Sequence, residues 1–261
     1  MYADYAQRYR FLWERHWWWR SREALLLSWI AKLMEGRKCE NCRILDIGCG
    51  DGLFFDRLSS FGEVEGLETD PSFASDPRWQ GRIRLGSLGE EAEILPDASY
   101  DLVLMLDVVE HIADDIAALR AARSALKPGG HLLITVPALG WLWSRHDEWN
   151  EHYRRYNPRE LERVLAAAGF EFGTMRYFFV WTVGPMLVRR WLLSRTKSGA
   201  GGEAVDLALG IPPAPINRLL TLVSRAEHAL GRYIPWPIGS SLLAVAQVAV
   251  NPTRMKCGVV S

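Results

Sequence analysis

Residues 44–52 have the sequence Ile-Leu-Asp-Ile-Gly-Cys-Gly-Asp-Gly, and this stretch decides the fold. Its apolar residues do not alternate with polar ones, which is typical of a strand buried on both faces of a parallel sheet. Asp46 lies near the carboxyl end of that strand, and the glycines at 48, 50 and 52 let backbone N–H groups come close to a ligand. We expect residues 53–60 to form a helix that begins at the same crevice, because open α/β sheets bind ligands outside the carboxyl ends of their strands.

The spacing of these glycines separates two classes of ligand-binding turn. The dinucleotide fingerprint is G-x-G-x-x-G, whereas this chain has G-x-G-x-G with an acidic residue two positions before the first glycine. Leu53 stands where the third glycine of the fingerprint belongs. The spacing therefore counts against a nucleotide-cofactor oxidoreductase.

The segment Asp-Ile-Gly-Cys-Gly-Asp-Gly resembles the first motif of the class I S-adenosylmethionine (SAM) methyltransferases. Three later segments resemble the same family in the same order. Residues 64–68 (Val-Glu-Gly-Leu-Glu) resemble its second strand, residues 100–111 its fourth strand with the exit loop Asp-Val-Val-Glu-His, and residues 126–137 the turn into its fifth strand. The resemblance implies a SAM-dependent methyltransferase that uses SAM as its cofactor and releases S-adenosylhomocysteine.

The expected elements between residues 43 and 137 alternate strand and helix, which specifies a parallel sheet. We expect an α/β fold with a doubly wound, mostly parallel seven-stranded sheet, N-terminal helices and a helical insertion before the last strand. The expected parts are an N-terminal helical cap (1–36), a SAM-binding Rossmann-like core (37–180), a helical insertion acting as lid or interface (181–239), and the last strand with a tail (240–261).

The resemblance also implies which residues bind SAM. In the family, the acidic residue before the glycines holds the ammonium group, and the one that ends the second strand binds both ribose hydroxyls; here these are Asp46 and Glu68. Most relatives bind the adenine amino group with an acidic residue after the third strand, but this chain has Gly86-Ser87-Leu88 there. The Ser87 hydroxyl is the candidate for a similar contact, and backbone N–H groups are candidates for binding the ring nitrogens. The expected cofactor-binding residues are Asp46, Gly48, Cys49, Gly50, Glu68, Thr69, Ser87, Leu88, Asp107, Val108, Trp18 and Arg22.

Residues 2–35 are expected to form one or two helices, interrupted at 16–23 by His-Trp-Trp-Trp-Arg-Ser-Arg-Glu. A similar Trp-Trp-x-x-x-Arg segment precedes the SAM domain of relatives and closes over the ligand, which implies a contact by Trp17, Trp18 or Arg22. Packing of these helices on one face of the sheet is the structural alternative.

Three histidines are candidates for catalysis. His111 follows the fourth strand, close to the expected position of the methyl group, and in some relatives this histidine acts as a general base. His146 and His152 lie in the connection after the fifth strand. An imidazole has the ordinary pKa to take a proton from a hydroxyl near neutral pH. The alternative for His111 is a cap on the next helix.

The connection at 139–156 is expected to bind the acceptor because it is dense in charged and aromatic residues. The expected substrate-binding residues are Trp141, Trp143, Arg154, Arg155 and Tyr156. An arginine fork suits a carboxylate or phosphate. One alternative is that ion pairs tie this loop to the N-terminal helices. The other is a metal site of His146, Asp147, Glu151 and His152, but its spacing matches neither H-E-x-x-H nor H-x-x-E-H, so no metal is expected.

Between the last two strands, we expect an apolar and basic helix at 186–193, a Ser/Gly-rich loop at 196–203 and an amphipathic helix at 216–230. Loops this long are usually functional. Three roles are consistent with this composition: a lid over an apolar substrate, a peripheral contact with a membrane, or the interface of a homodimer. In the first two cases the protein can be a monomer.

The chain has 261 residues, with 31 basic and 31 acidic side chains, so no overall field favours nucleic acid. Four cysteines, no signal-peptide pattern and no apolar run long enough to span a bilayer favour a cytoplasmic protein. We expect methyl transfer to a hydroxyl oxygen of a small-molecule acceptor, with a histidine removing the hydroxyl proton. Apolar and lipid-like molecules are among the candidate acceptors. The alternatives are a small-molecule N-methyltransferase and a non-catalytic SAM-binding regulatory protein.

Overall fold

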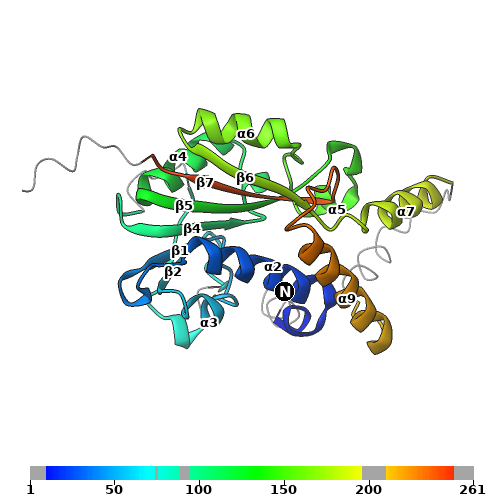
Figure 1. Ribbon diagram of the computed structural model, residues 1–261, viewed down its shortest axis with the longest axis horizontal. Coiled ribbons are helices and arrows are strands. Elements are labelled where there is room, and N and C mark those ends of the chain that lie inside the picture. Colours follow the sequence, from blue (N-terminus) through cyan, green and yellow to red (C-terminus); the bar gives the residue numbers. More distant parts are fainter. Residues whose placement is uncertain (1–9, 74–75, 89–94, 196–209, 250–261) are drawn as a thin grey trace, which may run out of the picture.

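The structure is a computed structural model that describes residues 10–73, 76–88, 95–195 and 210–249 (Figure 1). The expectations for residues 2–9, for the loop at 196–203 and for the tail from 250 lie outside the described residues.

A single seven-stranded sheet forms the centre of the molecule (Figure 1). Its strands are β1 (Arg43–Ile47), β2 (Glu63–Glu68), β3 (Ile83–Leu85), β4 (Tyr100–Leu106), β5 (Leu126–Pro137), β6 (Glu171–Phe178) and β7 (Ser241–Gln247). They lie in the order β3-β2-β1-β4-β5-β7-β6. Strands β1 to β5 pair in parallel, and β7 runs antiparallel to both of its neighbours. This confirms the expected mostly parallel α/β sheet.

Helices cover both faces of the sheet. Helices α4 (Asp115–Ala125) and α6 (Pro158–Ala167) pack on one face, and α2 (Trp17–Leu33) and α3 (Phe55–Leu58) on the other. Helix α9 (Ala214–Leu230) packs against α2, while α7 (Val183–Arg195) extends away from the sheet. The short helix α5 (Arg145–Trp149) lies in the connection after β5.

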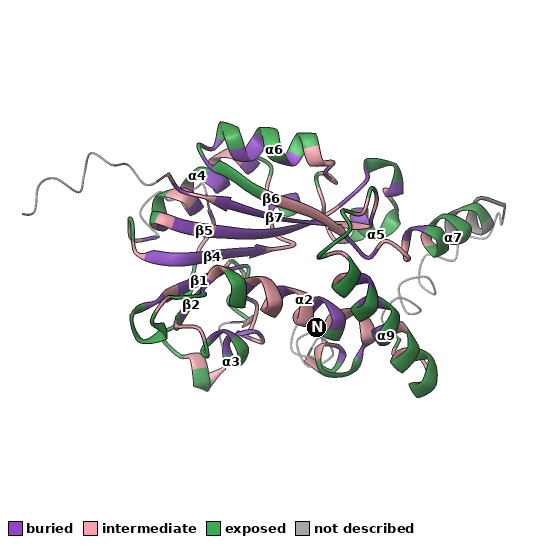
Figure 2. Cartoon of the chain, viewed as in Figure 1, coloured by how far each residue is buried: buried purple, intermediate pink, exposed green. Residues whose placement is uncertain are grey.

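The strands in the middle of the sheet are buried on both faces (Figure 2). In β4, Val103 and Met105 belong to the apolar cluster under α4 and α6, and Leu102 and Leu104 to the cluster under α2 and α3. Both faces are therefore apolar, which explains why the sequence of these strands lacks alternation.

The local sequence explains where the helices begin. Asn157 Oδ1 accepts a hydrogen bond from Glu160 N, and the Glu160 carboxylate accepts one from Asn157 N, so these two side chains form a capping box at the start of α6. The tryptophan triplet begins a helix and does not interrupt one. Residues 10–15 are also helical, and only His16 separates them from α2. His16 caps α2, because its Nδ1 accepts a hydrogen bond from Trp18 N.

One expected helix differs from the structure. The helix expected at 53–60 is shorter, because residues 51–54 form turns and the helical part is Phe55–Leu58. In the connection after β2, the carboxylate of Asp70 accepts from Ser72 N, and the described part of this connection contains the short 3-10 helix Pro77–Trp79. Among the helices with described coordinates, none is long and apolar enough to cross a bilayer.

Candidate active site

A cavity of about 670 Å³ opens at the carboxyl ends of β1, β2, β4 and β5. Helix α2 and the connection after β5 form its other walls, together with the two ends of the segment between β6 and β7. The crevice expected from the order of the elements is therefore present in the structure, and it is large enough for a ligand.

The turn after β1 forms the floor of the cavity. Gly48 and Gly50 have φ of 71° and 56°, a conformation that favours glycine. A Cβ at Gly48 would lie 2.6 Å from the side chain of Val108, so the close approach of these two loops also requires glycine. Gly50 N donates to Glu68 Oε2 at 2.8 Å, which joins the turn to the end of β2.

Asp46 and Arg22 are both buried beside this turn. Burial raises the pKa of Asp46 to about 7, against the opposing effect of the Arg22 guanidinium. Arg22 Nη2 lies 2.6 Å from Asp107 Oδ2 and donates to Thr135 Oγ1 at 3.1 Å, and Thr135 in turn donates to Asp107. This network joins α2 to the ends of β4 and β5.

Aromatic side chains of the N-terminal helices form one wall. Trp18 stacks on Phe179 with ring centroids 5.5 Å apart, and Trp17 lies 5.0 Å from Trp181. Trp17 and Trp18 line the cavity together with Trp13. The N-terminal segment therefore covers the site as well as the sheet.

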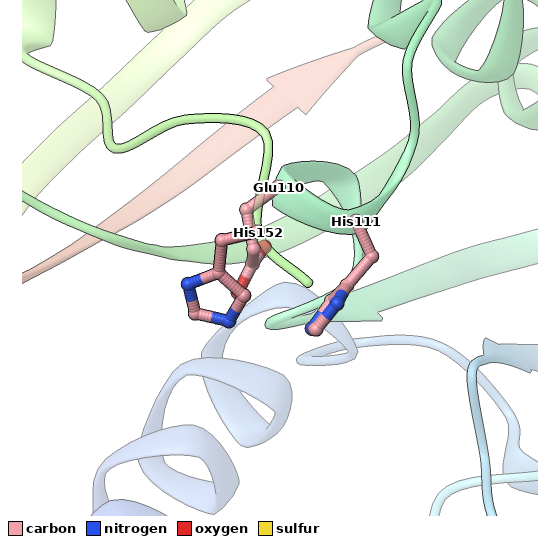
Figure 3. Close-up of side chains that lie close together, drawn as sticks. All are labelled: Glu110, His111 and His152. Carbon is pink, nitrogen blue, oxygen red and sulfur yellow. The ribbon is translucent and has the colours of Figure 1, made fainter. Parts of the chain in front are cut away.

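Two histidines and a glutamate meet on the opposite wall (Figure 3). The rings of His111 and His152 are perpendicular, with centroids 4.6 Å apart. Glu110 is fully buried, and neither oxygen of its carboxyl group has a hydrogen-bond partner among the described residues. Burial, and then Asp107, raise the pKa of Glu110 well above its ordinary value. Burial, and then His152, lower the pKa of His111.

Asp147 holds His152 in position. His152 Nδ1 lies 3.1 Å from Asp147 Oδ1, and Arg155 donates to both oxygens of this carboxylate, at 2.7 and 3.1 Å. Burial alone would raise the pKa of Asp147, but the hydrogen bonds from His152 and Arg155 outweigh it and hold that pKa well below its ordinary value. Because Asp147 is ionised, its carboxylate can only accept, so His152 Nδ1 is the donor of this hydrogen bond and Nε2 is the ring nitrogen left for another partner.

The same three residues have the geometry of a metal site. Each of Glu110, His111 and His152 offers one ligand atom, and these three atoms lie within 4.8 Å of one another. The metal alternative considered on sequence used a different set, and His152 is the only member that the two sets share.

The structure brings most of the expected site residues together. The cavity is lined by Asp46, Gly48, Cys49, Gly50, Glu68, Asp107, Trp18, Arg22, His111, His146, His152 and Arg155. The expected residues that are not among its lining are Thr69, Ser87, Leu88, Val108, Trp141, Trp143, Arg154 and Tyr156.

Arg154 and Tyr156 point instead to helix α4. Tyr156 is buried, and its hydroxyl donates to Asp115 Oδ2 at 2.8 Å. Arg154 Nη1 lies 2.6 Å from the same carboxylate, and Nη2 donates to Ala113 O. These contacts fix the loop to α4, whereas the structural alternative expected ion pairs to the N-terminal helices.

Sequence reasoning missed several lining residues, among them Glu110, Thr182, Met186 and Ser240. Thr182 and Ser240 lie at the two ends of the insertion, and their hydroxyl oxygens are 2.8 Å apart. The sequence did carry a signal for Ser240, because it directly precedes the last strand, β7, which pairs with β5, and the carboxyl end of β5 borders the cavity.

The model of a family described as "Methyltransferase domain" matches residues 18–173, more than half of the chain. The chain belongs to this methyltransferase family. It is a class I SAM-dependent methyltransferase with a Rossmann-like fold, and SAM is its cofactor.

Similar proteins include ubiquinone biosynthesis O-methyltransferases. The protein of this name from Azorhizobium caulinodans is 32% identical over 161 residues, which cover 53% of this chain and 62% of that one. Its counterpart from Cereibacter sphaeroides is 39% identical over 154 residues, covering 51% and 61%. The methyltransferase thus spans about three fifths of the length of these curated relatives.

Solved structures show the same fold at low sequence identity. A putative methyltransferase from Haloferax volcanii, in complex with a methyltransferase activator, has a TM-score of 0.57 at 18% identity, with 95% of this chain and 96% of that one covered. A SAM-dependent methyltransferase from Archaeoglobus fulgidus has a TM-score of 0.52 at 18% identity, with 86% and 94% covered.

The residues of the cavity fit SAM. The glycine turn presents backbone at positive φ with open space above Gly50. The carboxylates of Asp46 and Glu68 both border the cavity, one beside that turn and one at the end of β2. Acidic groups at these two places suit the ammonium and the ribose hydroxyls of the cofactor.

Proposed function

We propose that this methyltransferase transfers the methyl group of SAM to a hydroxyl oxygen of a small-molecule acceptor. The observation that carries the proposal is the pair His111 and His152 on the cavity wall, with His152 held by Asp147. A hydroxyl acceptor must lose its proton, and an imidazole that is neutral near pH 7 can take it. The names of the relatives, which are O-methyltransferases, support an oxygen acceptor.

The chain orients both reactants. Bound SAM supplies an electrophilic methyl group. Asp46 binds the ammonium group and Glu68 the ribose hydroxyls, while Trp18 covers the cofactor from α2. Holding the acceptor oxygen in line with the methyl group supplies most of the acceleration that such a reaction needs.

His111 is the general base in this proposal. Its lowered pKa keeps the ring neutral at pH 7, so it can accept the hydroxyl proton. His152 lies against it and is fixed by Asp147 and Arg155. The acceptor lies between these rings and the apolar side chains of Trp149 and Met186, which suits a hydroxylated molecule with an apolar or aromatic body.

The test uses SAM with a labelled methyl group, incubated with the protein and fractionated cell extract. Label in the small-molecule fraction, in an ether that resists mild base, is the expected result. Label in precipitated protein, or in an amine, would overturn the proposal. Binding of SAM without transfer to any fraction would favour the non-catalytic alternative.

The role of the histidines is tested with the acceptor found in this way. His111→Gln should lower kcat roughly a hundredfold or more, with little change in the Kd of SAM. His146→Gln is the matched control, because His146 also lines the cavity but does not belong to the cluster of Glu110, His111 and His152. Equal losses in both variants would contradict the assignment. Loss of activity in EDTA that a divalent cation restores would make the cluster a metal site and overturn the base role of His111.

A further inference from the structure

Helix α9 buries polar side chains against the protein and exposes apolar ones to solvent. Figure 2 shows that much of this helix is exposed. Thr221, Ser224 and Glu227 are buried. The exposed large apolar side chains of this helix, between 39% and 59% accessible, are Ile216, Leu219, Leu222, Val223 and Leu230. A surface helix of a soluble domain has the reverse arrangement, with its apolar stripe on the core.

Specific hydrogen bonds hold the helix in this orientation. Asn217 Oδ1 accepts from Trp17 N at 2.8 Å, and its Nδ2 donates to Arg15 O at 2.8 Å. Glu227 Oε2 accepts from the backbone N–H groups of Val180 and Trp181. Rotation of α9 to bury its apolar side would break these bonds and leave buried polar groups without partners, which is costly. The outward apolar stripe is therefore built into the fold.

The charges beside the stripe are all positive. Arg218, Arg225 and Arg232 recur every seven residues and so lie along one flank of the helix and its C-terminal turn. All three are exposed. Between residues 210 and 239 the sequence has one acidic residue, Glu227, and that one faces the protein. The exposed surface of this segment is thus cationic, although the whole chain has no net charge.

The apolar surface continues past the helix. Tyr233, which is 86% exposed, and Ile234 follow α9 directly. An aromatic ring with a polar tip is typical of a side chain at the boundary between lipid and water. Helix α9 belongs to residues 174–261, which lie beyond the part of the chain that the family model matches.

We propose that α9 docks on the surface of an anionic lipid bilayer. The outward stripe inserts at the boundary of headgroups and acyl chains, and the three arginines bind lipid phosphates. A second copy of the chain fits this surface less well. An antiparallel pair of α9 helices would bring the two arginine rows together, with no exposed acidic side chain on the segment to offset them. The proposal concerns this surface alone and does not depend on the identity of the acceptor.

Docking at α9 would position the cavity beside the membrane. Helix α9 contacts Trp17, a lining residue of the cavity, through Asn217. Thr182 and Ser240, which flank the insertion, also line the cavity. An acceptor dissolved in the membrane would thus have a short path to the site.

The test is sedimentation of the full chain with vesicles. We expect binding to mixed phosphatidylcholine–phosphatidylglycerol vesicles, weak binding to phosphatidylcholine alone, and a decline with added salt. The double variant Leu219→Glu, Leu222→Glu should abolish binding, and Arg225→Gln should lower the partition coefficient roughly fivefold. Phe172→Glu, at an exposed apolar residue of β6, is the matched control and should bind as the wild type does.

Calorimetry with SAM checks that each variant is folded, because these side chains lie outside the cavity. Equal binding to both kinds of vesicle, or none to either, would overturn the proposal. A dimer in analytical ultracentrifugation that Leu222→Glu dissociates would assign the surface to a second copy and also overturn it.

Discussion

At the scale of single residues, the protonation of Asp46 controls how the site receives its cofactor. With its pKa raised to about 7, half of the Asp46 side chains are neutral near physiological pH in the free protein. A neutral carboxyl group binds an ammonium group poorly, so binding of SAM must release a proton from this residue.

We therefore predict that the affinity for SAM rises with pH. Below pH 7 the Kd should fall about tenfold per pH unit, and it should level off above pH 7. Calorimetry in buffers of different ionisation enthalpy would detect the released proton. Asp46→Asn should bind weakly at every pH, and the same slope in this variant would contradict the assignment.

The buried Glu110 gives a prediction on stability. Because its pKa is raised in the folded state, the folded protein holds a proton that the unfolded chain releases, and stability falls as pH rises from the ordinary pKa toward the raised one. Glu110→Gln removes this dependence. Urea unfolding should find the variant more stable than the wild type at pH 8, with the difference shrinking toward pH 4. A constant difference would contradict the prediction, because it would mean that the pKa of Glu110 is the same in the folded and the unfolded state.

The role of a residue could be predicted from sequence where the residue belongs to a short motif whose local conformation is known. Asp46, Gly48 and Glu68 follow from spacing and resemblance, and all three line the cavity. Tyr156 could not be assigned in this way, because its partner Asp115 is 41 residues away and belongs to another element. The burial of Glu110 is likewise a result of tertiary packing, which no local pattern records.

At the scale of elements, helix α2 depends on one network of ion pairs and hydrogen bonds. Among the ion pairs of the described residues, only that of Arg22 joins α2 to the end of β4, and the same guanidinium donates to Thr135 in β5. The sequence suggested that this arginine contacts the cofactor, but the identity of its protein partners follows from the crossing of α2 over the sheet.

We predict that Arg22→Met lowers the free energy of unfolding by about 3 kcal/mol, because it leaves Asp107 without its partner in a partly buried place. Asp107→Asn should cost less, since Asn keeps a hydrogen bond with Thr135. Urea unfolding of both variants and of the double variant gives the coupling. Additive losses would mean that the two residues act independently.

At the scale of the whole molecule, segments far apart in sequence form one cover over the cavity. The helices expected as an N-terminal cap and as an insertion before the last strand pack against each other as α2 and α9. The topology of the sheet could be predicted because alternating strands and helices allow few arrangements. The packing of α9 could not, because its inward side is polar and a hydrophobic pattern predicts the opposite side.

This packing predicts a coupling between α9 and the cofactor. Asn217 lies outside the cavity but joins α9 to Trp17, which lines it. Asn217→Ala removes the hydrogen bonds to Trp17 N and Arg15 O, so it should loosen this cover and weaken SAM binding roughly fivefold, the equivalent of about 1 kcal/mol. Arg225→Gln, on the outward side of the same helix, is the control and should leave the Kd unchanged.

If α9 stabilises the complex with SAM, then by thermodynamic linkage bound SAM must stabilise the packing of α9. SAM should therefore slow amide exchange in α9 and in the first turn of α2. Hydrogen–deuterium exchange with and without SAM measures it. Protection confined to the glycine turn and the end of β2 would mean that the cofactor is held by the core alone. Protection that reaches α9 and is lost in Asn217→Ala would mean that a segment beyond the residues matched by the family model is coupled to cofactor binding.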